Sequence, residues 1–204
     1  MNEIKRIAFA GAQDTGKTTI AKELSSRFKT RNYITEYIDE AARFYVGRWR
    51  QPIMGVADQL FLIDKQLDKE QAIAPKCQIV FYDSPLFLGY AYTLLNWNDI
   101  KTVRDIDMLV HIYEKILING RYDLIFYLKP FRVPVDDGIR TKALTSQNSK
   151  IDLMIKSYLD LHNLEYVTID ATTVAERIET IDVMIKKFLS YEDKGEQHGE
   201  TKGI

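Results

Sequence analysis

The sequence predicts an α/β fold in which a parallel sheet lies between two layers of helices. Short apolar runs, typical of buried strands, recur at residues 7–10, 33–37, 78–82, 124–128 and 165–169. The run at 78–82 shows no polar alternation, as expected of a strand that helices cover on both faces. The segments between the runs are long enough to join parallel neighbours, which favours a three-layer α/β/α sandwich.

Most of the segments between the strands carry apolar residues at the spacing of one helix face. The clearest case is the set Ile106, Val110, Tyr113 and Leu117. The helices are expected at about residues 20–28, 39–45, 56–73, 86–95, 106–117, 148–158 and 174–188. Residues 191–204 are polar and contain glycine, so we expect a disordered tail after one domain of residues 1–190.

Composition limits the class of protein. With 204 residues and 46% hydrophobic residues, one domain buries about 70% of the surface of the unfolded chain. The net charge of −1 gives no overall basic excess of the kind that indicates nucleic-acid binding. The single cysteine, Cys77, cannot form an internal disulfide, and the three histidines lack metal-site spacing. No apolar run approaches the ~18 residues of a membrane span, so we expect a soluble cytoplasmic protein without a membrane partner.

A glycine loop follows the first strand and precedes the first helix, at residues 11–19. Gly11 and Gly16 permit backbone conformations that turn several N–H groups toward a phosphate at a helix N-terminus. Lys17 is expected to reach the β and γ phosphates, and the Thr18 hydroxyl to bind Mg²⁺. The residues expected to form this P-loop are Gly11, Ala12, Gln13, Asp14, Thr15, Gly16, Lys17, Thr18 and Thr19.

Other candidate residues fall at the ends of the predicted strands. Ligands in open parallel sheets bind beyond the carboxyl ends of the strands. Asp14, Glu36, Asp83 and the segment after Leu128 all belong to that edge. Their convergence there supports a ligand site next to the P-loop.

Phosphoryl transfer requires a phosphate cradle, Mg²⁺, a carboxylate that orients the acceptor, and cations for the transferred group. Asp83 is placed to hold Mg²⁺ through water or to take the proton of the acceptor hydroxyl; the alternative is a helix N-cap. Arg140 lies in a segment containing Pro and Gly that is suited to a lid over the phosphates, with Lys129, Arg132 and Lys142 nearby. The alternative for Arg140 is an ordinary solvated arginine.

Glu36, Glu40 and Arg43 follow the second strand and are candidates for acceptor binding. Glu40 and Arg43 could equally form a surface helix pair worth a few tenths of a kcal/mol. Arginines and aromatic residues alternate through Arg48, Trp49 and Arg50, a mixture that can stack bases and neutralise phosphates. The alternative for these aromatic residues is a place in the core or in an interface.

These motifs together resemble the P-loop nucleoside and nucleotide kinases. The resemblance rests on residues 11–19, residues 36–43, Asp83-Ser84 and the segment 137–140, and it extends over about residues 4–189. The most similar branch contains the ribosylnicotinamide kinase domain of a bifunctional regulator of NAD biosynthesis and thymidylate-kinase-like proteins, often labelled AAA-type ATPases. The chain departs from relatives at Gln13, where an acidic residue is common. It also departs from the thymidylate kinases at Ser84, where they have arginine.

The resemblance implies a five-stranded parallel sheet, ATP with Mg²⁺ as cofactors, and a lid at about residues 130–147 that carries Arg140. It also implies that Asp83 lies near the metal or the acceptor, and that residues 170–172 border the adenine. We therefore expect in-line transfer in which Lys17 and Arg140 stabilise charge, and Asp83 or Glu36 orients the acceptor.

Three functions are compatible with this chemistry. The first is a kinase for a small nucleoside or nucleotide. The second is a thymidylate-kinase-like enzyme that phosphorylates hydroxymethyluracil within DNA, with DNA as the partner. The third is a regulatory ATPase without an acceptor. The oligomeric state stays open, with a homodimer as one alternative.

Overall fold

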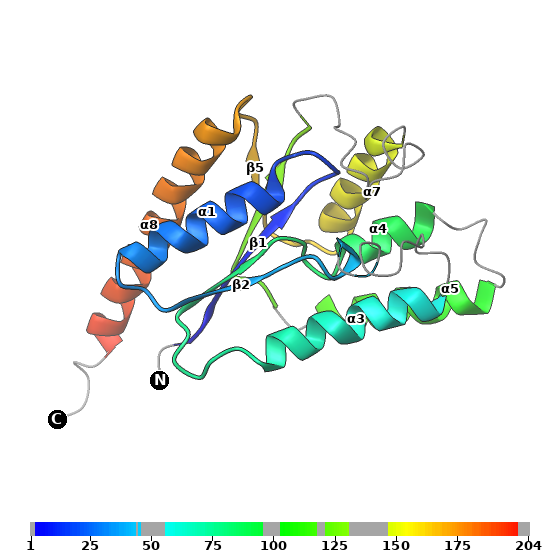
Figure 1. The fold of residues 1–204 in the computed structure, drawn as a ribbon, viewed down its shortest axis with the longest axis horizontal. Helices are drawn as coiled ribbons and strands as arrows, with labels where there is room; N and C mark the ends of the chain where they lie inside the picture. Colours follow the sequence, from blue (N-terminus) through cyan, green and yellow to red (C-terminus); the bar gives the residue numbers. More distant parts are fainter. Residues whose placement is uncertain are drawn as a thin grey trace.

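The computed structural model describes residues 3–43, 45, 56–95, 103–117, 121–130 and 147–199. Figure 1 shows strands and helices alternating along the chain, as the sequence predicts. The elements are β1 (Lys5–Ala10), α1 (Lys17–Thr30), β2 (Thr35–Ile38), α3 (Val56–Gln71), β3 (Ile79–Tyr82), α4 (Leu88–Leu95), α5 (Val103–Leu117), β4 (Leu124–Leu128), α7 (Asn148–Leu161), β5 (Val167–Ile169) and α8 (Val174–Gly199).

The five strands form one sheet in the order β2-β3-β1-β4-β5, and every neighbouring pair is parallel. β1 lies at the centre, where Ile7 pairs with Phe81 of β3 and with Leu124 of β4. Because β1 is the central strand, the loop that follows it opens at the middle of the carboxyl edge. The predicted fold class is confirmed.

Helices cover both faces of the sheet. Ile7 and Phe9 of β1 pack with residues of α1 and α8, whereas Ala8 and Ala10 pack with residues of α4 and α7. Successive strand residues point to opposite faces, so one strand contributes to both cores. A smaller cluster joins α3 to α5 through Ile63 and Leu109. Figure 1 shows these two helices side by side.

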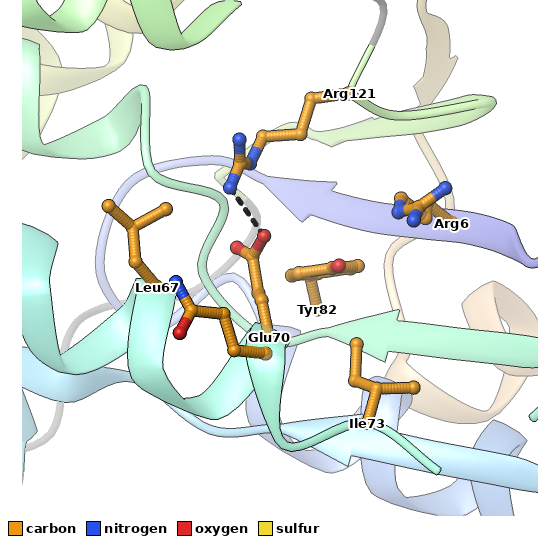
Figure 2. A pocket seen from close by; sticks show the side chains of 7 residues that line it. Arg6, Leu67, Glu70, Ile73, Tyr82 and Arg121 are labelled. Atoms are coloured by element: carbon orange, nitrogen blue, oxygen red, sulfur yellow. Dashed lines mark hydrogen bonds and ion pairs between the residues drawn. The ribbon is translucent and has the colours of Figure 1, made fainter. Parts of the chain in front are cut away.

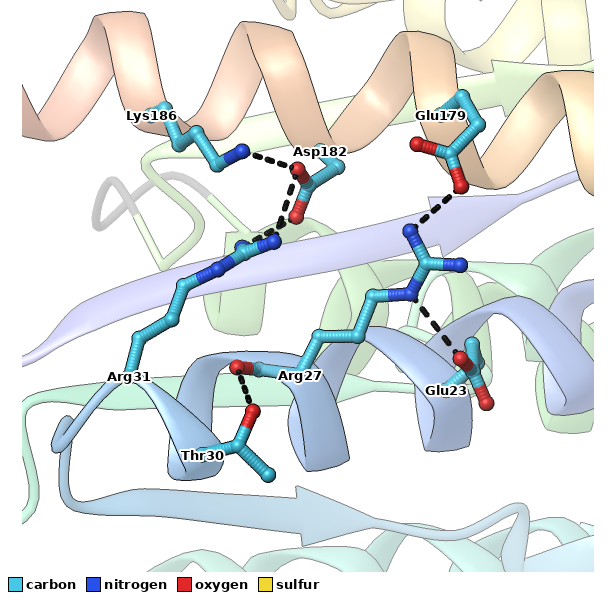
Figure 3. A network of polar contacts seen from close by, with 7 residues as sticks. All are labelled: Glu23, Arg27, Thr30, Arg31, Glu179, Asp182 and Lys186. Atoms are coloured by element: carbon cyan, nitrogen blue, oxygen red, sulfur yellow. Dashed lines mark hydrogen bonds and ion pairs between the residues drawn. The ribbon is translucent and has the colours of Figure 1, made fainter.

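Ion pairs tie α8 to α1 (Figure 3). Asp182, whose side chain is 3% exposed, accepts hydrogen bonds from Arg31, and its carboxylate lies 2.6 Å from the Lys186 ammonium. Burial alone would raise the pKa of Asp182, but the hydrogen bonds from Arg31 and Lys186 outweigh it and hold the pKa below its usual value. Arg27 makes a more exposed contact with Glu179 at 2.6 Å. The helix that begins at the P-loop is therefore fastened to the C-terminal helix.

The C-terminal region differs from the expectation of a disordered tail. α8 continues to Gly199, so residues 191–199 are helical, and residues 200–204 lie outside the described residues. Glutamate, lysine and glutamine are frequent in this stretch and have good helix propensity, and extending an existing helix is easier than nucleating one. Among the described residues, no helix is both long enough and apolar enough to cross a membrane.

Candidate phosphate-binding site

Within the loop of residues 11–16, Gly11, Asp14 and Gly16 have positive φ, a conformation that few side chains permit. Gly11 has φ +146° and Gly16 has φ +90°, and Gly16 is the N-cap of α1. A Cβ atom on Gly11 would lie 2.6 Å from the carbonyl oxygen of Leu128. The first glycine is therefore required both by φ and by the close approach of β4.

Lys17 folds back over this loop. Its Nζ donates hydrogen bonds to the carbonyl oxygens of Gly11 at 2.8 Å and Ala12 at 2.7 Å. Thr15 Oγ1 donates to the same Ala12 oxygen at 3.0 Å. The first turn of α1 contains no acidic residue, so the helix dipole and the Lys17 ammonium together favour an anion here.

Asp83 follows β3 and lies beside the start of α1. Its carboxylate is 1% exposed and accepts hydrogen bonds from Thr18 Oγ1 at 3.1 Å and from Tyr37 OH at 2.9 Å. The pKa of Tyr37 is raised mainly by burial and in addition by the negative charge of Asp83. The phenol therefore keeps its proton and donates a hydrogen bond. Both carboxylate oxygens point to neighbouring elements, which favours the ligand-site interpretation of Asp83 over the N-cap interpretation.

Thr18 and Asp83 supply a hydroxyl and a carboxylate, the oxygen ligands that Mg²⁺ takes in nucleotide sites. Within the described part of the chain, no group of three or more His, Cys, Asp or Glu side chains could hold a metal ion. Mg²⁺ commonly uses one or two protein ligands together with waters and phosphate oxygens. The residues present therefore fit a magnesium ion that is held jointly with a nucleotide.

Arg177 of α8 supports the loop from beneath and was not among the residues expected from the sequence. Its side chain is fully buried and donates to three carbonyl oxygens, those of Thr15 at 2.9 Å, Lys129 at 2.6 Å and Ala171 at 2.7 Å. It thereby connects the P-loop to the ends of β4 and β5. The available signal was an arginine four residues before Ile181, on the apolar face of this helix.

The start of α7 borders the loop and was also missed. Asn148 Nδ2 donates to the Gln13 carbonyl at 3.3 Å. Burial raises the pKa of Asp152, while a hydrogen bond from Tyr127 and the charges of Lys156 and Lys17 lower it. The loop lysine therefore has a half-buried carboxylate in its electrostatic surroundings.

A family model described as an AAA domain matches residues 6–177. The chain belongs to this AAA domain family. The match begins in β1 and ends at Arg177, so it contains the P-loop, Asp83 and the arginine beneath the loop.

Several solved structures resemble this chain in fold. A NadR protein in complex with NR matches with a TM-score of 0.67 and 22% identity, over 82% of this chain and 44% of that chain. NadR in complex with NAD and AMP-PNP gives a TM-score of 0.68 and 20% identity, over 87% of this chain and 48% of that chain. The chain thus spans less than half the length of the NadR chains.

A deoxyadenosine kinase from M. mycoides with bound dATP matches with a TM-score of 0.62 and 16% identity, over 89% of this chain and 99% of that chain. At these identities the likeness concerns the fold. The resemblance to P-loop nucleoside and nucleotide kinases is thereby confirmed, and this AAA domain has a nucleoside-kinase-like P-loop fold.

The three residues expected to bind the acceptor, Glu36, Glu40 and Arg43, follow β2 or lie in it. Glu36 lies on the face of β2 opposite to Tyr37. The pKa of the Cys77 thiol is raised mainly by burial of the thiol, and the charge of Glu36 raises it further. Glu40 and Arg43 are half-buried after β2, and the charge of Glu40 contributes to the raised pKa of Tyr37. The structure therefore brings Tyr37, rather than Glu36, onto Asp83.

Several expected residues lie outside the described residues, namely Arg48, Trp49, Arg50, Arg132, Arg140 and Lys142. The predicted lid at 130–147 is described only at its two ends. Lys129 pairs with Asp170 at 2.8 Å, and these two residues directly follow β4 and β5, whose ends Arg177 connects.

Proposed function

We propose that this AAA domain is an ATP- and Mg²⁺-dependent kinase that transfers the γ-phosphoryl group to a hydroxyl or phosphate of a nucleoside-type acceptor. The observation that carries the proposal is the Thr18–Asp83 hydrogen bond of 3.1 Å beside the Lys17 loop. It supports the proposal because the two residues proposed as metal ligands lie next to the proposed anion site, as phosphoryl transfer requires. The fold shared with NadR and with a deoxyadenosine kinase supports a nucleoside as the acceptor class.

The roles of the residues follow from their contacts. The loop amides and Lys17 hold the β and γ phosphates, and Thr18 with Asp83 holds Mg²⁺, which neutralises charge on those phosphates when bound. Tyr37 fixes the Asp83 carboxylate in place. Asp83 is better supported than Glu36 as the carboxylate that orients the acceptor, because Glu36 lies on the other face of β2. Arg140 is proposed as the lid cation that stabilises the transferred phosphoryl group. This role rests only on the resemblance to the P-loop nucleoside and nucleotide kinases.

Transfer of label from [γ-³²P]ATP tests this proposal. The acceptors are a panel of nucleosides that includes NR and deoxyadenosine, nucleoside monophosphates, and DNA that contains hydroxymethyluracil. Lys17→Ala should reduce transfer at least about 100-fold, since it removes the cation that stabilises the transferred group. Lys29→Ala is the matched control, because Lys29 is an exposed lysine of the same helix.

Each result assigns the function. Label on a small nucleoside or nucleotide that depends on Lys17 supports the proposal. Label on DNA replaces it with the base-modifying kinase. Release of inorganic phosphate that no acceptor alters replaces it with a regulatory ATPase. Full transfer by a folded Lys17→Ala protein contradicts all three.

A further inference from the structure

A polar pocket lies between α3 and the sheet, away from the P-loop (Figure 2). Its volume is about 200 Å³, and it is partly open to solvent. The side chains that matter to its chemistry are those of Arg6, Leu67, Glu70, Ile73, Tyr82 and Arg121.

This pocket is separate from the nucleotide site. Arg6 is the second residue of β1, and Arg121 precedes β4, so both belong to the amino end of the sheet. Gly11 is five residues further along, about 17 Å at about 3.3 Å per strand residue. Tyr82 is the last residue of β3 and directly precedes Asp83, but its side chain packs in the cluster of Ala8 and Val80, on the face of the sheet opposite to α1.

Cations dominate the pocket. Arg121 NH2 lies 2.6 Å from Glu70 Oε2, with side chains 21% and 11% exposed, and this pair joins α3 to the start of β4. Arg6 adds a second guanidinium, so the three ionised groups carry a net charge of +1. Burial raises the pKa of Glu70, while the charges of Arg121 and Arg6 lower it.

Two buried polar atoms at the pocket, Glu70 Oε1 and Arg121 Nε, have no hydrogen-bond partner within the described part of the chain. The Tyr82 hydroxyl lies beside the Arg6 guanidinium. Tyr82 is fully buried, and its phenol O–H is a donor at neutral pH that can point to a ligand oxygen. A buried polar group without a partner costs about 1–3 kcal/mol, and folded proteins contain few of them. The pocket thus presents two N–H or O–H donors and one acceptor for a ligand.

We propose that this pocket binds a small phosphate-class anion. Guanidinium groups pair with phosphate oxygens in forked geometry, and Tyr82 OH adds a further donor to such an oxygen. A phosphate that retains one proton can donate it to Glu70 Oε1, which sulfate cannot do at neutral pH. Leu67 and Ile73 offer apolar walls, and the volume exceeds that of one phosphate, so the ligand is either inorganic phosphate or a small phosphomonoester.

Isothermal titration calorimetry of the full chain with inorganic phosphate tests this site. All proteins carry Lys17→Ala, so that phosphate binding at the P-loop is weakened equally in each of them. In this background, Arg6→Gln should weaken phosphate binding at least tenfold and Tyr82→Phe at least threefold. Arg104→Gln, which changes an exposed arginine of α5, should leave the affinity unchanged. Sulfate should bind at least threefold more weakly than phosphate.

Tyr82→Phe also separates ligand binding from folding. It removes one hydroxyl and leaves the buried ring in place, so its melting temperature in phosphate-free buffer should stay close to that of the parent. Phosphate should raise the melting temperature of the parent more than that of the Arg6→Gln variant.

Tighter binding of glycerol phosphate than of inorganic phosphate assigns the site to a phosphomonoester, and the reverse assigns it to free phosphate. Equal phosphate affinity in the parent, Arg6→Gln and Tyr82→Phe, or no binding by the parent at 10 mM, overturns the proposal.

Discussion

Replacing Arg177 with lysine keeps the positive charge but removes the forked geometry beneath the P-loop. In the structure three different nitrogens of Arg177 donate to the carbonyl oxygens of Thr15, Lys129 and Ala171. A single ammonium group can reach about one of these oxygens at a time. Two hydrogen bonds that involve a charged group are therefore lost, at about 1.5–3 kcal/mol each. We expect the free energy of unfolding to fall by about 3–6 kcal/mol, a large part of the stability of a typical domain.

Urea unfolding followed by circular dichroism measures this loss, with Arg104→Lys as the matched control because Arg104 is exposed. The control should change the free energy of unfolding by less than about 0.5 kcal/mol. ATP binding should also weaken in Arg177→Lys, because the Thr15 carbonyl that shapes the loop loses its donor. A loss of stability below about 1 kcal/mol with unchanged ATP affinity would refute the idea that Arg177 fixes the loop.

Three further changes test other parts of the molecule. Asp182→Asn should lower the free energy of unfolding by about 1–3 kcal/mol at pH 7. Because the pKa of Asp182 is lowered by folding, its contribution is present above about pH 3.9 and lost as the pH falls through the folded pKa, so denaturation curves of the two proteins should converge in acid. Glu179→Gln, at a side chain 65% exposed, is the control and should cost less than about 0.5 kcal/mol. Gly11→Ala should abolish ATP binding in calorimetry, since the added Cβ would lie 2.6 Å from a main-chain oxygen; micromolar affinity would contradict this. Tyr37→Phe should raise the Mg²⁺ concentration for half-maximal transfer about tenfold by releasing the Asp83 carboxylate, and an unchanged requirement would show that Tyr37 has no such role.

Local sequence signals were sufficient to predict the five strands and the P-loop. Each strand is a short apolar run between turn residues, and the loop needs only two glycines, a lysine and a threonine at fixed spacing. The second strand shows the limit of such signals. Pairing with β3 begins at Thr35 and sets which side chains share a face, and this register puts Tyr37 on the side of Asp83 and Glu36 on the side of Cys77. A one-residue change of register would exchange the two faces.

The contacts that join distant segments could not be predicted from spacing. Arg177 reaches the P-loop across 162 positions, and Arg121 reaches Glu70 across 51. From the sequence alone both arginines would be predicted to lie on the surface, because arginine side chains are usually exposed. Their burial follows from the packing of α8 and α3 against the sheet, and that packing depends on the whole fold.

The contacts of Lys17 show which groups a bound phosphate would compete with. Its ammonium donates to two neutral carbonyl oxygens of the loop, and a phosphate oxygen would add the attraction of opposite charges to the same hydrogen bonds. A triphosphate can therefore take these donors at a net gain, while the loop is held in shape from below by Arg177. Any phosphate-class anion in solution competes for the same donors. Phosphate binding at the Arg6 pocket must for this reason be measured in proteins that lack the Lys17 ammonium, where the two anion sites no longer share one signal.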